Sequence, residues 1–116
     1  MRAFDIIAKK RDNKENNHFQ LIKSGIKENV IQGLLGLSLY GGNFDLIQET
    51  LVEYSGNSDE NIRGIAILCF GHIARIYGKI NTELVLPIVQ KGLKDKNSFV
   101  RGHSHSALDD IEFFVK

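Results

Sequence analysis

An internal repeat limits what this chain can fold into more than any other feature. The run Ile62-Arg63-Gly64 recurs as Val100-Arg101-Gly102, a shift of 38 residues (101 − 63). An earlier run, Ile31-Gln32-Gly33, matches the first at a shift of 31 residues (63 − 32) and has glutamine in place of arginine. With the longer shift, apolar and small residues also coincide: Ala66 with Ser104, Phe70 with Leu108 and Ile73 with Ile111. Repeats of this length predict helical hairpins that each bury the face of a neighbour.

The last repeat, residues 84–115, has the pattern of two antiparallel helices. Apolar residues recur with helical spacing on each side of a polar turn at residues 95–98, which also supplies an N-cap. Pro87 lies too deep in the first helix to occupy its first position, so it predicts a bend there. The expected buried residues are Val85, Leu86, Val89 and Leu93 in the first helix and Val100, Ala107, Leu108, Ile111 and Phe114 in the second.

This order of a proline-containing helix, Leu-x-Asp, a short turn and Val-Arg resembles a HEAT repeat, the hairpin unit of α-solenoids. The resemblance covers residues 44–115 well and residues 17–42 loosely. It implies an all-α fold: a short right-handed α-solenoid of about three HEAT-like helical hairpins plus an N-terminal helix. A chain of 116 residues is long enough for one such domain, residues 1–116, and too short for a second core.

The first half of the chain predicts shorter helices separated by polar or glycine-containing turns. A helix over residues 2–11 and a polar loop over residues 12–17 precede a brief helix that ends at Gly25, since glycine suits the left-handed end of a helix. A helix over residues 27–40 then ends at Gly41-Gly42. The expected buried stripes are Ile31, Leu35, Ser38 and Leu39 in this helix; Phe44, Ile47, Leu51 and Tyr54 after the cap Asn43; and Ile62, Ala66, Cys69, Phe70, Ile73 and Tyr77 before Gly78.

Composition excludes several classes of protein. With 42% hydrophobic and 25% charged residues and no long uncharged apolar run, the chain lacks a spanning helix. Its first ten residues lack the central apolar segment of a secretory signal, and its single cysteine, Cys69, lies in an apolar run. We therefore expect a cytoplasmic protein with a buried thiol. The formal charge of +1 gives no global field that would attract nucleic acid or an anionic membrane.

Three glycines occupy one equivalent position in the repeats. Gly33, Gly64 and Gly102 lie about 160 to 200° round the helix from the expected buried stripe, so they share a face. Glycine within a helix costs about 1 kcal/mol relative to alanine, which indicates that another element packs closely there. Two interpretations remain open. Either the face is covered by the N-terminal helix or a tight crossing between hairpins, or it forms a concave groove that receives a partner.

The charged positions of the repeat favour a structural role. Arg63 and Arg101 could bind phosphate, but in HEAT-like repeats an arginine here pairs with an acidic turn residue of a neighbouring unit. Asp59 and Asp95 are available for such pairs. We therefore expect ion pairs between units rather than a nucleic-acid site.

No catalytic or metal-binding pattern is complete. His103 and His105 would point about 160° apart on a helix, and only His105 and Asp109 share a face, so three ligands do not converge. The serines beside these histidines lack a nucleophile elbow, and no glycine-rich phosphate loop is present. We expect no enzyme activity, no metal and no cofactor.

Function is then expected to be binding. Standalone helical-repeat modules of this size are similar to bacterial immunity proteins, which implies an inhibitor that neutralises a cognate toxin domain. A scaffold or adaptor subunit of a larger complex and a HEAT-like nucleic-acid-binding protein are the alternatives, and a lyase resembling the HEAT-like bilin lyases is a remote one. Exposed aromatic residues and acids on the second helices suit a basic protein partner such as a nuclease toxin. The predicted partner-binding residues are Tyr40, Ile67, Leu68, Arg75, His105, Asp109, Asp110, Glu112 and Phe113.

Overall fold

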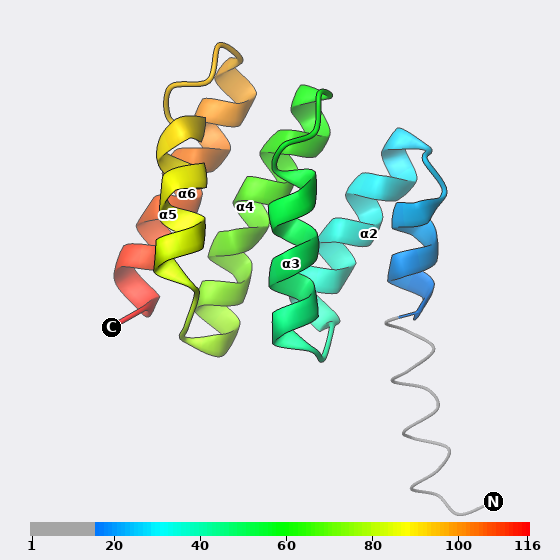
Figure 1. Cartoon of the computed structure of the whole chain (residues 1–116), viewed down its shortest axis with the longest axis horizontal. Helices are drawn as coiled ribbons and strands as arrows, with labels where there is room; N and C mark the ends of the chain where they lie inside the picture. The colour runs from blue at the N-terminus through cyan, green and yellow to red at the C-terminus, as the bar shows by residue number, and fades with distance from the viewer. Residues whose placement is uncertain (1–15) are drawn as a thin grey trace, which may run out of the picture.

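The computed structural model describes residues 16–116, and every regular element in this range is a helix (Figure 1). After a helical segment at residues 16–23 come α2 (Lys27–Tyr40), α3 (Phe44–Tyr54), α4 (Glu60–Tyr77), α5 (Thr82–Gly92) and α6 (Ser98–Phe114). The all-α prediction is confirmed for this part of the chain. The predicted helix over residues 2–11 lies outside the described residues, and residues 16 and 17, expected in a loop, are already helical. Among the described helices, none is long and apolar enough to cross a membrane.

The helices follow one another across the molecule in chain order. In Figure 1, α3 and α5 lie in front of α2, α4 and α6, and consecutive helices run in opposite directions. The long helix α4 is central because it contacts α2, α3, α5 and α6. One end of the molecule therefore carries the α3–α4 and α5–α6 turns. At the other end α2, α4 and α6 finish while α3 and α5 begin (Figure 1).

Capping side chains explain where most of these helices begin. The carboxylate of Asp59 accepts hydrogen bonds from the backbone N–H groups of Asn61 and Ile62, which would otherwise lack a partner in the first turn. Three asparagines accept one such bond each: Asn43 before α3, Asn81 before α5 and Asn97 before α6. The predicted left-handed conformation is confirmed at Gly25 (φ 72°), and Gly78, predicted to end α4, is left-handed as well (φ 67°).

The core is formed chiefly by α4. Its predicted stripe is confirmed from Ile62 to Ile73, and Phe70 is the largest side chain that is fully buried. Tyr77 at the end of the stripe is half-buried, and its hydroxyl donates to the Gly41 carbonyl at 2.9 Å. Outside α2, six other residues expected in the core are only half-buried: Phe44, Tyr54, Leu86, Leu93, Leu108 and Phe114.

The buried side of α2 was predicted in the wrong register. Apart from Ser38, which is buried, the expected stripe of Ile31, Leu35 and Leu39 is only half-buried. The buried residues are instead Val30, Gly33, Leu34, Leu37 and Ser38. The reason is that α2 is covered from two directions, by α4 and by the segment at residues 16–23, so its buried side is rotated toward that segment. A helix that is apolar on several sides does not reveal by its periodicity which side is covered.

Cys69 is a core residue, as its sequence context predicts. Its side chain is fully buried and its S–H group lies 3.7 Å from the Leu34 carbonyl oxygen, which accepts a weak hydrogen bond. Burial raises the pKa of the Cys69 thiol to about 12. The thiolate form that reacts with electrophiles is therefore scarce at neutral pH in the folded protein.

Candidate partner-binding surfaces

Arg63 connects two successive turns. Its Nε and Nη2 groups donate to the two carboxylate oxygens of Asp95 at 2.9 and 3.0 Å, and Nη1 donates to the carbonyls of Asn57 and Ser58 at 3.0 and 3.2 Å. This bidentate pair and the Asn97 N–H lower the pKa of the Asp95 carboxyl group. All three guanidinium nitrogens already donate within the protein. The predicted ion pair with a neighbouring unit is thus confirmed for Arg63, and a phosphate site there is not supported.

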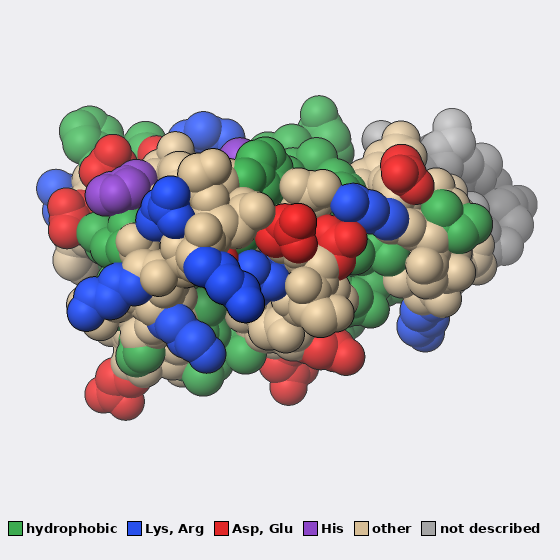
Figure 2. All heavy atoms as spheres, turned by 90° about the horizontal axis from the view of Figure 1, so that it is seen from above, with side chains coloured by type: hydrophobic (Ala, Val, Ile, Leu, Met, Phe, Trp, Pro, Cys, Tyr) green, Lys and Arg blue, Asp and Glu red, His purple; other side chains and the backbone are tan. Residues whose placement is uncertain are grey.

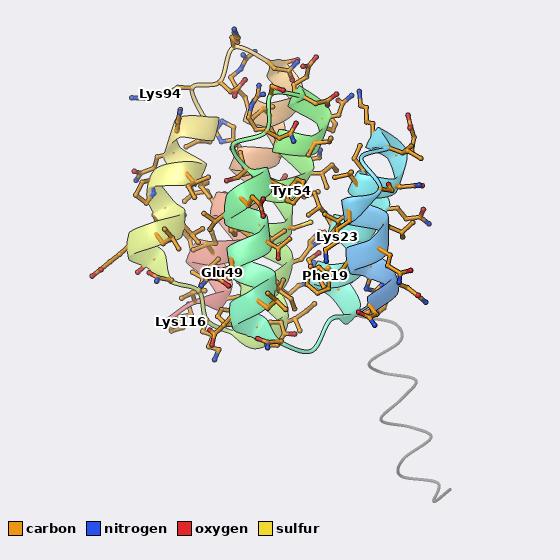
Figure 3. All side chains as sticks on the ribbon, turned by 45° about the vertical axis from the view of Figure 1, so that its right-hand side comes forward. Phe19, Lys23, Glu49, Tyr54, Lys94 and Lys116 are labelled. Carbon is orange, nitrogen blue, oxygen red and sulfur yellow. The ribbon has the colours of Figure 1, made fainter. Side chains whose placement is uncertain are left out.

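A hollow of about 940 Å³ lies between these two turns. Arg63 and Asp95 line it together with the exposed residues Lys91 and Lys96, and Figure 2 shows Lys and Arg side chains gathered over this end of the α5–α6 hairpin. Lys94 extends from the same turn (Figure 3). Because the Arg63 guanidinium is already occupied, only the lysine ammonium groups can bind an anionic partner here. We name this feature the turn cleft; sequence analysis missed it because it forms between two turns that are far apart in the chain.

The glycine face is internal packing over most of its length. A Cβ atom on Gly33 would lie 2.7 Å from the His18 carbonyl oxygen, because residues 16–23 lie against α2 (Figure 3, where Phe19 is labelled). On α4, a Cβ atom on Gly64 would lie 3.1 Å from the Phe99 ring, and one on Gly71 would lie 2.8 Å from an Asp110 carboxylate oxygen. At these positions the covered-face interpretation is confirmed and the open-groove interpretation is wrong. Gly102 differs, since a Cβ atom there would meet nothing within 4 Å.

The predicted partner-binding residues do not form one surface. Ile67 is 2% exposed, since it lies beneath Gly92 of α5, so its assignment to the surface is wrong. Leu68 is half-buried against the core, and Asp110 is half-buried with its carboxylate toward α4. The residues that are exposed as predicted are Tyr40, Arg75, His105, Asp109, Glu112 and Phe113.

Exposed apolar side chains concentrate at the end of the molecule opposite the turn cleft. Tyr40, Ile76 and Phe113 lie in the last turns of α2, α4 and α6 and are 75%, 47% and 69% exposed. Leu46 and Leu84 lie in the first turns of α3 and α5, at the same end of the molecule (Figure 1). We call these five residues the distal apolar edge. Sequence analysis identified Tyr40 and Phe113 but missed the other three residues. Ile76 could have been predicted to be exposed, because it falls outside the buried stripe of α4.

Two histidines lie in the packing between helices. The Nδ1 atom of His72 lies 3.2 Å from the Ser38 hydroxyl oxygen; burial lowers the pKa of His72, and nearby Arg75 lowers it further while Asp110 opposes the shift. Burial also lowers the pKa of His103, whose ring packs edge-on against Phe99 at 4.2 Å. Within residues 16–116, no three His, Cys, Asp or Glu side chains come close enough together to hold a metal ion.

We expect the stability of the fold to decrease as the pH falls below the ordinary histidine pKa of about 6.5. His72 and His103 have lower pKa values in the folded than in the unfolded chain, so the unfolded chain takes up protons first. The fold keeps its full stability while the pH is above the histidine pKa of the unfolded chain. It loses stability as the pH falls from that pKa towards the lower pKa of the folded chain. Urea unfolding at several pH values measures this loss.

The matched variants are His103→Leu, which removes a half-buried imidazole, and His105→Gln, which alters an exposed one. His103→Leu should reduce the pH dependence of the unfolding free energy more strongly than His105→Gln does. An unaltered pH dependence in His103→Leu would show that protonation of His103 does not cause the loss of stability.

The chain matches no model of a protein family, no curated protein and no solved structure. A functional assignment therefore depends on the surfaces described above.

Proposed function

We propose that this chain is a non-enzymatic protein-binding module that presents the distal apolar edge to a protein partner. The observation that carries this proposal is that, within residues 16–116, five of the seven exposed large hydrophobic residues lie at one end, the other two being Ile26 and Phe99. Large apolar side chains that gather at one surface commonly mark a site of association, and aromatic residues such as Tyr40 and Phe113 are frequent anchors of interfaces.

The framework we propose for this module is a short right-handed α-solenoid of about three HEAT-like hairpins. Ion pairs between successive units support it: Lys27 pairs with Asp59 at 3.2 Å, and Arg63 pairs with Asp95 at 2.9 Å. The glycine contacts of α2 and α4 support it as well, because each of these helices receives an adjacent helix at closely related positions. A stack of this kind aligns the ends of its helices and thereby forms an edge.

The partner that suits this edge best is a basic protein, and our first choice is a toxin domain that the chain neutralises as an immunity protein. Exposed acids accompany the apolar residues: Asp109 and Glu112 precede Phe113 on α6, and Asp45 and Glu83 lie in the first turns of α3 and α5. The exposed Arg75 and the Lys116 ammonium group, 5.8 Å from the Phe113 ring, interrupt these acids, so the negative field is local. Such acids accelerate encounter with a basic partner, whereas buried aromatic contacts slow dissociation. A scaffold or adaptor subunit would use the same surface.

A second candidate follows from the turn cleft. Its lysines, Lys91 and Lys96, with Lys94 beside them, favour an anionic partner such as nucleic acid at the opposite end of the molecule. Charge alone carries this second proposal, because the Arg63 guanidinium is already used within the fold.

Affinity capture from cell extract with quantitative mass spectrometry distinguishes the two candidates. The edge variant carries Tyr40→Ser, Ile76→Ser and Phe113→Ser, and the cleft variant carries Lys91→Gln, Lys94→Gln and Lys96→Gln. After circular dichroism has confirmed folding, a partner of the edge should be depleted about tenfold or more by the edge variant and retained by the cleft variant, since anchor residues contribute about 2 kcal/mol or more each. The opposite pattern would support the second candidate, and proteins captured equally by both variants would contradict both.

If the chain is an immunity protein, the captured protein should be toxic. Expressed alone it should arrest growth, and co-expression of the wild-type chain, but not of the edge variant, should restore growth. With the purified pair, Asp109→Lys and Glu112→Lys should slow association in a salt-dependent way, while Tyr40→Ala and Phe113→Ala should raise the dissociation rate. A partner without toxicity would favour the scaffold or adaptor alternative.

A further inference from the structure

The helix α6, at the end of the helix array, holds its arginine in the same way as α4 holds the arginine that contacts the next hairpin. Arg63 lies four residues after the N-cap Asp59, and Arg101 lies four residues after the N-cap Asn97. Each arginine donates through Nη1 to the carbonyl of the residue six positions earlier, at 3.0 Å for Arg63 to Asn57 and 2.7 Å for Arg101 to Asp95. The two guanidinium groups are therefore anchored in the same way to their own turns.

The two arginines differ in what their remaining donors reach. Nε and Nη2 of Arg63 donate to the carboxylate of Asp95, in the turn of the next hairpin. Within residues 16–116, the corresponding donors of the half-buried Arg101 have no carboxylate partner. A guanidinium whose Nη1 is fixed while its other donors have no acceptor among the described residues is prepared for a bidentate carboxylate.

The glycines that follow the two arginines also differ in whether a neighbouring helix lies against them. A Cβ atom on Gly64 would lie 3.1 Å from the Phe99 ring of the adjacent α6, whereas Gly102 faces open space. The α6 surface around Gly102 thus leaves room for another helix. Beyond it this surface is polar, since His105, Ser106 and Asp109 are exposed where the equivalent α4 positions are Ile67, Leu68 and Gly71. A polar face suits reversible docking rather than a permanent core.

We propose that the outer face of α6 docks a helical hairpin of a partner protein whose inter-helix turn supplies an aspartate or glutamate to Arg101. Charge complementarity selects this occupant over a second copy of the chain. Asp95 accepts a hydrogen bond from the N–H two residues later, as Ser24 does in the first turn, so a copy stacked end to end would offer Arg101 the hydroxyl of Ser24 instead of a carboxylate. The Arg101 contact lies near the start of α6, at the end of the molecule opposite the distal apolar edge, and does not depend on that edge.

The test uses the full chain with a photoreactive benzoylphenylalanine in place of the exposed Ser106, irradiated in living cells. The expected product is a cross-link to a partner peptide from a helical hairpin with Asp or Glu in its turn. Adding Arg101→Gln should reduce the cross-link about tenfold or more, because charge-assisted bidentate bonds are lost. Arg75→Gln, which changes an exposed arginine on α4, is the matched control and should have no effect.

A charge swap makes the assignment specific. Arg101→Asp should abolish the cross-link, and replacing the partner's turn carboxylate with arginine should restore it. Absence of a cross-link, a cross-link that persists in Arg101→Gln, or a cross-link to a second copy of this chain would each overturn the proposal. Loss of the cross-link only in the variant with Tyr40→Ser, Ile76→Ser and Phe113→Ser would also overturn it, since binding would then depend on the distal apolar edge.

Discussion

Replacing Phe70 with alanine should lower the free energy of unfolding by about 3 to 5 kcal/mol, since a fully buried ring leaves both its transfer free energy and a cavity behind. Phe70 is 0% exposed and lies on α4, which contacts all the other labelled helices, so the surrounding side chains cannot collapse into the space without moving several helices. Urea denaturation followed by circular dichroism measures this loss, which would leave a chain of this size close to unfolding.

The matched control is Leu108→Ala, because Leu108 occupies the same place in the repeat. The sequence predicts similar losses for the two residues, but Leu108 is only half-buried in the structure. Its replacement should therefore cost clearly less than that of Phe70. Equal losses would contradict the packing described here, and a near-neutral Phe70→Ala would contradict the central position of α4.

The same substitution should have opposite effects at two equivalent glycines. Gly33→Ala should lower the free energy of unfolding by about 1 to 3 kcal/mol, because the new methyl group would lie 2.7 Å from the backbone oxygen of His18 and residues 16–23 would have to move. Gly102→Ala should raise it by up to about 1 kcal/mol, because alanine is the better helix former and nothing lies within 4 Å. Neither glycine has a positive φ angle, so backbone strain does not contribute.

Denaturation of the two single variants and of the double variant measures both effects, which should add because the sites lie on different helices. A stabilising Gly33→Ala would mean that residues 16–23 do not cover α2 in solution, and the groove interpretation of this face would regain support. A destabilising Gly102→Ala would mean that the outer face of α6 is already occupied.

Patterns that act within one helix were sufficient to predict much of this fold. The spacing of apolar residues predicted the helices and the buried stripe of α4, and Asn43, Gly25 and Gly78 marked helix ends, because a cap or a left-handed residue acts on its own turn. The pairing of Arg63 with the next unit was also predictable, although that prediction depended on a resemblance rather than on spacing.

Only the tertiary structure decided which faces of these helices are covered. Gly33, Gly64 and Gly102 are equivalent in sequence, yet residues 16–23 cover the first, α6 covers the second and no part of residues 16–116 covers the third. Arg63 and Arg101 share one motif and one local anchor, but only Arg63 reaches a carboxylate. Likewise, Ile67 is buried beneath α5 while Ile76, on the same helix, is exposed at the distal apolar edge. The physical reason is that periodicity fixes the angle between side chains on one helix, whereas burial depends on neighbouring helices that lie far away along the chain.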